Sequence, residues 1–484
     1  MSTNFRTGVL PDSCCVRQDC HSLFGVFWYC KNHLFFAFKE TGADQPVALK
    51  KRLMVDNDLV FDMLRRLILE ETQSMISVKK ARQTILARFY RLPLELINIL
   101  DAQGRVSGED ICATRNIPAA DNSAMDGYAV RHRDTANATA ANPVILKIIE
   151  DIPAGKVPRK KLTSGEAARI MTGAIIPAGA DTVIRQEDAR KNGQKVSIFV
   201  AAEKGRDIRF AGEDVKNGEI VIPQGTVIRP AQIGMLASLG HSSVRVYRRP
   251  RVAILATGDE LVDICKVPPP AKIINSNSYA LAAQVLACGG IPIMLGITRD
   301  KKTALQKKFQ KALLADLIIS SGGVSVGDFD FVKDVMGEMG NAMHFWQVAM
   351  RPGKPLAFGA IGDVPLFGLP GNPVSVMVSF EQFVRPCLLK MQGHAKIFRQ
   401  TIQAVSREEI KKTAGIKHFI RAIVNKEKDK YIAGTTGEQG SGILKSMVLA
   451  NALIVLEDNE TQIKKGAAVS VQLLDDSLLF TDQS

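Results

Sequence analysis

The sequence lacks the long apolar segments and the leader that would direct a chain into or across a membrane. No apolar run reaches the roughly 18 to 20 residues that span a bilayer. The longest run, residues 23–38, is interrupted by Lys31, Asn32 and His33. At the N-terminus, no basic segment leads into an apolar one as it does in a secretory signal. We therefore expect a cytoplasmic protein with no membrane partner.

Cysteine spacing that would indicate a disulfide framework or a zinc site is also lacking. The chain holds 8 cysteines in 484 residues, and with no export signal they are expected to be reduced thiols. Half of them lie in the first 74 residues, which are also rich in aromatic side chains. The chain changes character near Met75, where a helix pattern begins with Ser77 as its N-cap. Residues 1–74 are either an extension that belongs to the protein or the product of a start site placed too early, and of the two we expect the second, with Met75 as the natural start.

The chain carries a net charge of +14, yet it lacks the usual signs of a nucleic-acid or nucleotide-binding protein. It has no long basic block and no basic stripe interleaved with aromatics. The densest basic stretch, residues 301–314, has the spacing of an amphipathic helix with lysines on its exposed face. Neither GxxxxGK[ST] nor GxGxxG occurs, which excludes a P-loop NTPase and argues against a dinucleotide fold. We expect an anionic partner that is not nucleic acid.

Residues 252–392 alternate short apolar runs with helical patterns. This alternation predicts an α/β unit whose parallel sheet is covered on both faces. Residues 130–250 contain short β-like pieces separated by glycine and proline turns, and residues 396–475 have an all-β pattern with one clear hairpin. The sequence therefore predicts several domains, with the α/β unit between β-rich modules.

Four polar loops follow the predicted strands of the α/β unit: residues 257–261, 298–300, 321–330 and 369–373. Ligands of open α/β sheets bind beyond the carboxyl ends of the strands, so these loops are expected to share one site. Carboxylates gathered there without cations would repel one another, and a divalent metal relieves that repulsion. Mg²⁺ fits oxygen ligands and phosphate oxygens. The residues of these loops that are expected to form the site are Thr257, Asp259, Glu260, Asp300, Ser325, Asp328 and Asp330.

Other segments leave two interpretations open when taken alone. The glycines of "SGGVSVGD" allow close approach of an anion, but Ser325 and Asp328 could equally cap the following helix. In "MRPGKP", Arg351 and Lys354 flank a stiff turn that can hold an oxyanion or face solvent. Segments 118–130 and 169–188 are typical of turns as well as of ligand sites.

Seven segments together resemble the molybdopterin molybdenumtransferases, a family that includes the C-terminal half of gephyrin. They occur in the family's order over residues 75 to about 475, although each segment alone is weak. The segments are "NSAMDGYAV", "IMTGAIIPAGADTVIRQED", "AGEDVKNGE", "ILATGDELV", "SGGVSVGDFDFVKDV", "MRPGKPLAFG" and "FGLPGNPVSVMVSF".

The resemblance implies a multidomain fold that combines α/β and β-rich parts, with four domains and a homodimer. An elongated linker domain is formed by 75–116 and 209–248, and a β-rich domain by 117–208. Residues 249–394 form a three-layer α/β domain with a mostly parallel sheet, and 395–484 a C-terminal β-barrel. The active site lies on the α/β domain and is completed by the partner subunit.

The resemblance also implies the reaction. Adenylylated molybdopterin and molybdate react in the presence of Mg²⁺ to give the molybdenum cofactor and AMP. The alternatives are a molybdopterin adenylyltransferase, which the protein could also meet as a partner, and a non-catalytic scaffold of the same fold. By position in the motifs, the catalytic residues are Asp126, Thr172, Asp259, Glu260, Asp300 and Asp330, of which Glu260 and Asp330 hold the metal. The substrate-binding residues are Gly322, Gly323, Ser325, Arg351, Lys354, Pro355, Pro370, Pro373, Arg421 and Ser441.

Overall fold

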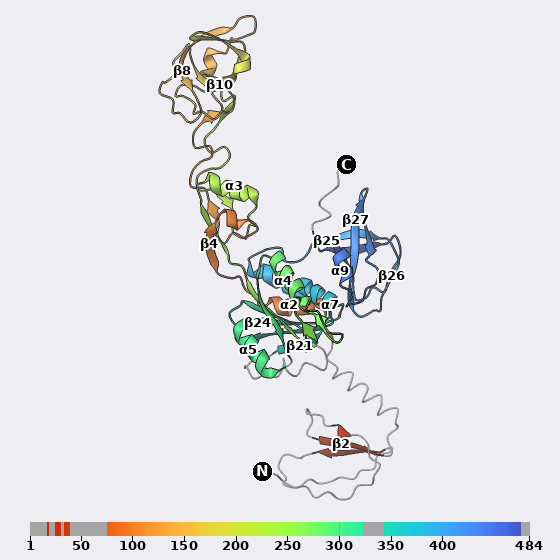
Figure 1. Ribbon diagram of the computed structural model, residues 1–484. Coiled ribbons are helices and arrows are strands. Elements are labelled where there is room, and N and C mark those ends of the chain that lie inside the picture. The colour runs from red at the N-terminus through yellow and green to blue at the C-terminus, as the bar shows by residue number, and fades with distance from the viewer. Residues whose placement is uncertain are drawn as a thin grey trace. The chain divides into compact units, whose positions relative to one another are not determined.

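The computed structural model describes residues 75–299, 301–322 and 343–475, and the backbone of three short strands nearer the N-terminus (Figure 1). The chain divides into two compact units, Met1–Met75 and Ile76–Ser484. In the first unit, β2 (Gly25–Cys30) pairs antiparallel with β1 (Arg17–Gln18) and with β3 (His33–Phe38). Within the described residues, no helix has the length and apolar character needed to cross a membrane.

The centre of the second unit is a six-stranded sheet of order β19-β16-β20-β24-β23-β21. The first four strands are parallel, and β23 and β21 are added antiparallel at one edge. The sequence therefore predicted the mostly parallel sheet correctly, but it gave no sign of this antiparallel edge. The strands are β16 (Arg251–Thr257), β19 (Ile291–Thr298), β20 (Leu317–Ser321), β21 (Met343–Gln347), β23 (Pro355–Ile361) and β24 (Val364–Leu369).

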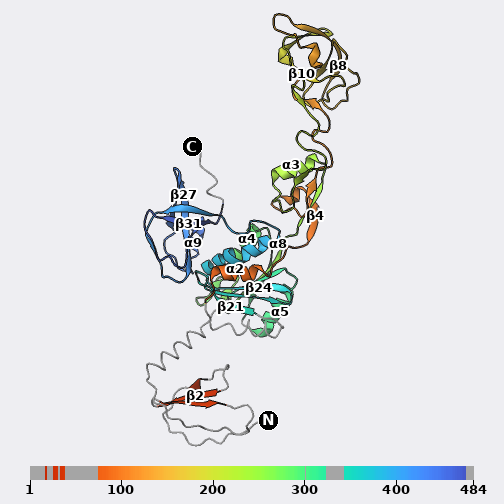
Figure 2. The same ribbon diagram turned by 180° about the vertical axis from the view of Figure 1, so that it is seen from behind.

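Helices cover both faces of this sheet, as the views from front and back show (Figures 1 and 2). On one face, Leu305 and Phe309 of the basic helix pack against Ala253 and Leu255. The opposite face carries the larger core, to which all the other helices contribute. The basic helix is α5 (Lys302–Ala312); the others are α2 (Val78–Leu86), α4 (Asn277–Ala287), α7 (Pro373–Ser379) and α8 (Arg385–Met391), with a π-helical turn (Phe380–Val384) between the last two.

Helix α2 begins as the sequence predicted, because the Ser77 side chain accepts a hydrogen bond of 3.2 Å from the Lys80 amide. Its buried face, with Val78 and Ile85, belongs to the core of the α/β domain. The family resemblance had implied that this segment belongs to the linker domain. The helix predicted after "SGGVSVGD" lies outside the described residues.

Two segments far apart in sequence form a small module around a core that includes Ile111, Ile222 and Leu236. Strand β4 (Leu94–Asn98) pairs with β15 (Ser243–Tyr247), and β5 (Ile111–Cys112) pairs with β14 (Ile220–Ile222). The helix of this module is α3 (Pro230–Ser238).

Between these two segments the chain builds a β-rich module with a sheet of order β10-β7-β9-β8-β12-β11. A separate pair joins β6 (Asn122–Ser123) to β13 (Ile208–Arg209). The sheet strands are β7 (Gly127–Val130), β8 (Val144–Ile152), β9 (Glu166–Ile170), β10 (Thr182–Arg185), β11 (Ala189–Asn192) and β12 (Lys195–Ile198).

The C-terminal region is a closed barrel, as the family resemblance implied. Five strands pair in the order β27-β28-β25-β31-β29, and β29 pairs back with β27. A further strand, β22 (Met350–Arg351), runs parallel to β27 and carries the chain of the α/β domain onto the barrel. The barrel strands are β25 (Thr401–Ser406), β27 (Lys417–Glu427), β28 (Lys430–Thr435), β29 (Ala452–Leu456) and β31 (Ala468–Leu473).

Candidate active site

The carboxyl ends of β19, β16, β20 and β24 meet at one edge of the sheet. Thr257, the last residue of β16, lies opposite Thr298 of β19, and the amide of Gly258 donates to the Thr298 carbonyl over 3.3 Å. The amide of Gly322 donates to the Leu369 carbonyl over 3.1 Å. The loops that begin at these residues therefore share one rim, which is where open α/β sheets bind ligands.

Glycine is required at Gly322. Its φ is +86°, and a Cβ there would lie 2.6 Å from the Thr257 carbonyl oxygen. A side chain would be strained by the backbone and would collide with the neighbouring strand. The glycine thus keeps the start of the polar loop bare and close to β16.

The acidic turn after β16 presents two exposed carboxylates, those of Asp259 and Glu260. Glu260 folds back over Gly258, with its carboxylate oxygens 2.5 and 2.6 Å from where a Cβ of that glycine would lie. The Lys272 ammonium donates to the carbonyl of Asp259, which fixes the turn through its backbone. Neither carboxylate has a hydrogen-bond or ion-pair partner among the residues that the structure describes, so both are available to a ligand.

Asn277, at the start of α4, joins two loops of the rim. Its side-chain amide donates to the Ser321 hydroxyl over 3.0 Å and to the Gly371 carbonyl over 2.7 Å. One side chain therefore sets the spacing between the loops after β20 and β24. Nothing in the sequence indicates the contact with Gly371, which is 94 residues away.

Three buried hydroxyls lie behind the rim. Thr257, Thr298 and Ser320 are 5%, 2% and 1% exposed, and their side-chain oxygens have no hydrogen-bond partner among the residues that the structure describes. They belong to adjacent strands, with Thr257 opposite Thr298. Thr298 and Ser320 were not singled out from the sequence, because a hydroxyl at a strand end is ordinary there.

The "MRPGKP" segment places two cations where the α/β domain meets the barrel. Arg351 of β22 pairs with His418 of β27, and the Lys354 carbonyl accepts from the Val348 amide over 2.8 Å. Gly353 makes the turn with a φ of +95°, and a Cβ there would lie 2.5 Å from the Ser379 hydroxyl. Arg351 and Lys354 are exposed, and in the described parts of the chain neither has an acidic partner. This unbalanced positive charge fits an oxyanion.

Arg421 of β27 is buried, with 1% of its surface exposed. Its Nε donates to the Ser446 hydroxyl over 3.0 Å and its Nη2 to the Gly440 carbonyl over 2.9 Å. Burial and the positive charge of Arg351 lower the pKa of Arg421 to about 10, so it stays protonated at neutral pH. The structure thus shows Arg421 holding the loop that carries Ser441; the predicted contact with substrate stays a prediction.

Ser441 faces the start of α7. Its hydroxyl accepts from the Asn372 side chain over 3.1 Å, and its carbonyl accepts from the Val374 amide over 3.1 Å. The loop of Pro370 and Pro373 is therefore in contact with the barrel through Ser441. The third predicted proline, Pro355, is the first residue of strand β23.

His418 gives the barrel junction a testable pH dependence. Burial, followed by the charges of Lys412 and Arg351, lowers the pKa of His418 from 6.5 to about 4. In the unfolded chain His418 therefore binds a proton near pH 6.5, whereas in the folded chain it binds one only near pH 4. Stability is then fully present above pH 6.5 and falls as the pH is lowered toward 4.

We expect the acid-induced fall in the free energy of unfolding to be about 1–2 kcal/mol smaller in His418→Gln, because glutamine does not titrate. Denaturant unfolding of both proteins near neutral pH and near the lower end of that range measures the difference. Equal pH dependence in the two proteins would contradict the assignment.

Asp126 and Thr172 lie together in the β-rich module. One carboxylate oxygen of Asp126 accepts from the Thr172 amide over 2.7 Å and from its hydroxyl over 2.8 Å. These two hydrogen bonds lower the pKa of Asp126. Both residues are exposed, and the described residues provide no hydrogen bond between this pair and the rim of the α/β sheet. The structure brings these two predicted residues together but not to the others.

Several predicted residues lie outside the described part of the chain: Asp300, Gly323, Ser325, Asp328 and Asp330. Within the described residues no group of three metal-ligating side chains occurs. The magnesium site, of which Glu260 is described and Asp330 is not, therefore stays a prediction.

In the described part of the chain, bare glycine turns, free carboxylates and unpaired cations surround the carboxyl ends of a parallel sheet. They define an α/β protein suited to an anionic small molecule. Sequence models of known families match the chain in three places. Residues 76–240 match the "MoeA N-terminal region (domain I and II)", residues 253–390 a "probable molybdopterin binding domain", and residues 403–474 the "MoeA C-terminal region (domain IV)".

Relatives named molybdopterin molybdenumtransferase match over most of their length. The protein from Nostoc sp. is 40% identical over 78% of this chain and 88% of its own. That from Haemophilus influenzae is 37% identical over 82% and 98%. Two crystal structures of a molybdopterin biosynthesis MoeA protein from Pyrococcus horikoshii are 31% identical, with TM-scores of 0.73 and 0.71, and cover 83% of this chain and 100% of theirs. The chain belongs to the molybdopterin molybdenumtransferase family.

Proposed function

We propose that this enzyme inserts molybdenum from molybdate into adenylylated molybdopterin and releases AMP, the final step of molybdenum cofactor biosynthesis, in the cytoplasm. The observation that supports this most is the rim itself. Carboxylates on one loop and cations on another, without partners among the described residues, are what a phosphoanhydride and an oxyanion require when they react together. Membership of the family supplies the identity of the substrates.

In this proposal the positively charged residues bind molybdate and the acidic residues bind Mg²⁺. Arg351 offers a planar fork of donors and Lys354 a compact charge, and together they hold molybdate by two kinds of contact. The bare backbone at Gly322 lets a phosphate or pterin oxygen approach the strand end. Glu260 and Asp330 would hold Mg²⁺, which neutralises the charge on the phosphate oxygens when bound. Glu260 fits this role because its exposed carboxylate has no competing partner among the described residues.

Asp126 and Thr172 can act in this reaction only if they reach the active site from another part of the assembly. Their carboxylate and hydroxyl belong to the β-rich module, and no described contact links them to the rim of their own chain. We propose that the protein works as a homodimer in which this module reaches the site of the second copy. The adenylyltransferase that makes the substrate is the natural transient partner, because it hands over an anionic compound.

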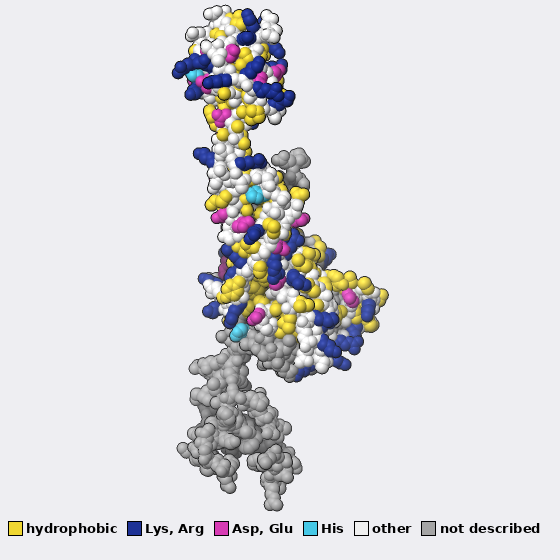
Figure 3. Space-filling model, turned by 90° about the vertical axis from the view of Figure 1, so that its left-hand side faces the viewer, with side chains coloured by type: hydrophobic (Ala, Val, Ile, Leu, Met, Phe, Trp, Pro, Cys, Tyr) yellow, Lys and Arg dark blue, Asp and Glu magenta, His cyan; other side chains and the backbone are white. Residues whose placement is uncertain are grey.

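One face of the molecule shows Lys and Arg interspersed with acidic and apolar side chains rather than forming a stripe (Figure 3). That distribution supports small anions over nucleic acid as the partners of the net positive charge.

One assay tests the function. Purified protein receives adenylylated molybdopterin, Mg²⁺ and molybdate, and AMP and active cofactor are measured. Molybdate-dependent AMP release supports the proposal, and its absence sinks it. Consumption of ATP with adenylylation of molybdopterin would instead identify an adenylyltransferase. Substrate binding without turnover would identify a scaffold.

Lys354→Ala tests the oxyanion role. The lysine has no partner to lose among the described residues, so the fold should be unaffected. Removing one of two cations should raise the molybdate concentration needed for half-maximal rate about tenfold, with a smaller change in the maximal rate. Lys465→Ala, an exposed lysine of the barrel, is the matched control. An unchanged molybdate dependence in Lys354→Ala would contradict the assignment.

A further inference from the structure

The loop that carries Asp126 is held at both ends by different strands. At its start, β6 pairs with β13, and the Ala124 amide donates to the Asp207 carbonyl over 2.8 Å. At its end, Gly127 of β7 pairs with Arg185 of β10, and the Gln186 amide donates to the Asp126 carbonyl over 3.0 Å. The position of Asp126 therefore depends on where residues 185–186 and 207 lie relative to each other.

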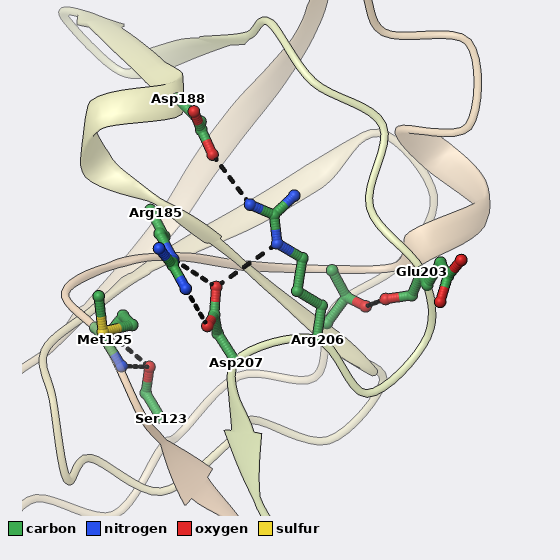
Figure 4. Close-up of polar contacts among 8 residues, drawn as sticks. Ser123, Met125, Arg185, Asp188, Glu203, Arg206 and Asp207 are labelled. Atoms are coloured by element: carbon green, nitrogen blue, oxygen red, sulfur yellow. Dashed lines mark hydrogen bonds and ion pairs between the residues drawn. The ribbon is translucent and has the colours of Figure 1, made fainter.

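The Thr172 turn is tied to the same loop. The Gly173 amide donates to the Ser123 carbonyl over 2.8 Å, and the Ser123 amide donates to the Ala174 carbonyl over 2.9 Å. The Ser123 hydroxyl in turn bonds the backbone of Met125 (Figure 4). Any shift of this loop would therefore change the two hydrogen bonds between Thr172 and Asp126.

An ion pair joins the two anchor points directly. Arg185 Nε and Nη2 donate to the two carboxylate oxygens of Asp207 over 2.9 and 3.0 Å (Figure 4). This two-bond fork fixes the orientation as well as the distance of the two residues. Arg206 approaches the same carboxylate at 3.6 Å and pairs with Asp188 at 3.2 Å.

The pair is poorly explained by stability alone. The Arg185 side chain is 44% exposed, and ion pairs with such exposure contribute little to folding. Asp207, by contrast, is 11% exposed and has a φ of 54°, a left-handed backbone that few residues adopt readily. Without Arg185, this nearly buried carboxylate would keep only its longer contact with Arg206, and its backbone, which anchors Ala124, would be free to move.

We propose that Arg185 and Asp207 are positioning residues for the reaction: their ion pair sets the place and direction of the Asp126 carboxylate and its contact with Thr172. The inference rests on the proposed function, in which Asp126 acts at the active site. Asp126 belongs to a different module from the rim of the α/β sheet. A small shift of the strands that hold its loop would therefore displace the carboxylate from the reacting groups. Displacements of that kind cost about tenfold to a hundredfold in rate.

The variants separate geometry from charge. Asp207→Asn keeps a residue that tolerates the left-handed backbone but weakens the fork. Arg185→Gln removes the fork, and Arg185→Lys keeps the charge with one bond, which provides a mild variant where the first is unstable. Arg206→Gln is the matched control, since it removes a charge from the same cluster and leaves the fork intact.

Two readouts are needed. We expect Arg185→Gln and Asp207→Asn to lower kcat about tenfold with little change in KM for molybdate, and Arg206→Gln to leave both unchanged. In an Asp126→Asn background the same substitutions should cost nothing further, because they act through that carboxylate. A full tenfold loss in that background would overturn the proposal.

The second readout does not depend on activity. Hydrogen exchange of the Thr172 amide, which the Asp126 carboxylate protects, should be about tenfold faster in Arg185→Gln and Asp207→Asn and unchanged in Arg206→Gln. Unchanged exchange in the fork variants would also overturn the proposal. If the wild-type protein were inactive in the assay but Thr172 exchange were still faster in the fork variants, only the proposed function would be refuted. The failure of the proposed function and the failure of this inference are therefore distinguishable.

Discussion

Glu260→Gln is expected to lower the rate of molybdenum insertion at least about a hundredfold without loss of the fold. Glutamine keeps the size and shape of the side chain but replaces the carboxylate, the ligand type that Mg²⁺ prefers, with a neutral amide. The substitution should leave folding intact, because no described side chain bonds the Glu260 carboxylate and the turn is held through the backbone and Lys272.

The control is another exposed acid in the same domain. Asp363 lies in the turn between β23 and β24, at the end of the sheet away from the rim. Asp363→Asn changes the net charge by the same amount, so it should keep wild-type turnover. Titrating Mg²⁺ completes the measurement: Glu260→Gln should need more metal for whatever rate remains. If Glu260→Gln kept wild-type turnover at low Mg²⁺, Glu260 would not be a ligand of the metal.

The central strands β16 and β20 were predictable because they are buried on both faces. Residues 252–257 and 317–321 form continuous buried runs, and short apolar runs of this kind identify parallel strands. Strands β23 and β21 were missed for a physical reason. β21 ends just before "MRPGKP" and β23 begins at its last proline, so both flank a segment whose proline and glycine predict a loop. Their pairing is decided by the edge of the sheet they meet.

The rim residues were predictable from their place after strands, whereas their supports were not. Glu260 and Gly322 stand in loops whose composition is unusual. Asn277, Arg185 and Asp207 are ordinary residues whose roles come from partners 94, 22 and 22 residues away. Local sequence patterns report helix and strand periodicity, but they carry no information about which distant backbone a side chain meets.

Arg421 shows the same limit in a predicted site residue. The family resemblance implies a cation near the substrate at Arg421, but the strand pairing decides where the side chain goes. Arg421 lies opposite Leu453 of β29, and its guanidinium is turned to the loop of Gly440 and Ser446. Burial was not foreseeable, because arginine is seldom fully buried unless its donors are satisfied.

Arg421→Ala is expected to lower the free energy of unfolding by about 2–4 kcal/mol, from the cavity and the unsatisfied groups that it leaves. It should also release the loop that carries Ser441, and so weaken both its contact with Asn372 and molybdate binding. Ser446→Ala removes one partner of the guanidinium and keeps the charge. That variant should change stability and molybdate dependence in the same direction by a smaller amount. Denaturant unfolding and limited proteolysis within 436–446 measure these effects.

Molybdate itself separates the two roles of Arg421. The guanidinium is buried near Arg351, and no carboxylate of the described residues pairs with it, so an oxyanion bound nearby relieves repulsion between the two cations. Molybdate should therefore raise the melting temperature of the wild-type protein, and by less in Arg421→Ala. Ser446→Ala keeps both charges and should retain most of the increase. If Arg421→Ala unfolded like wild type yet lost all response to molybdate, Arg421 would be a direct ligand rather than the support of the Ser441 loop.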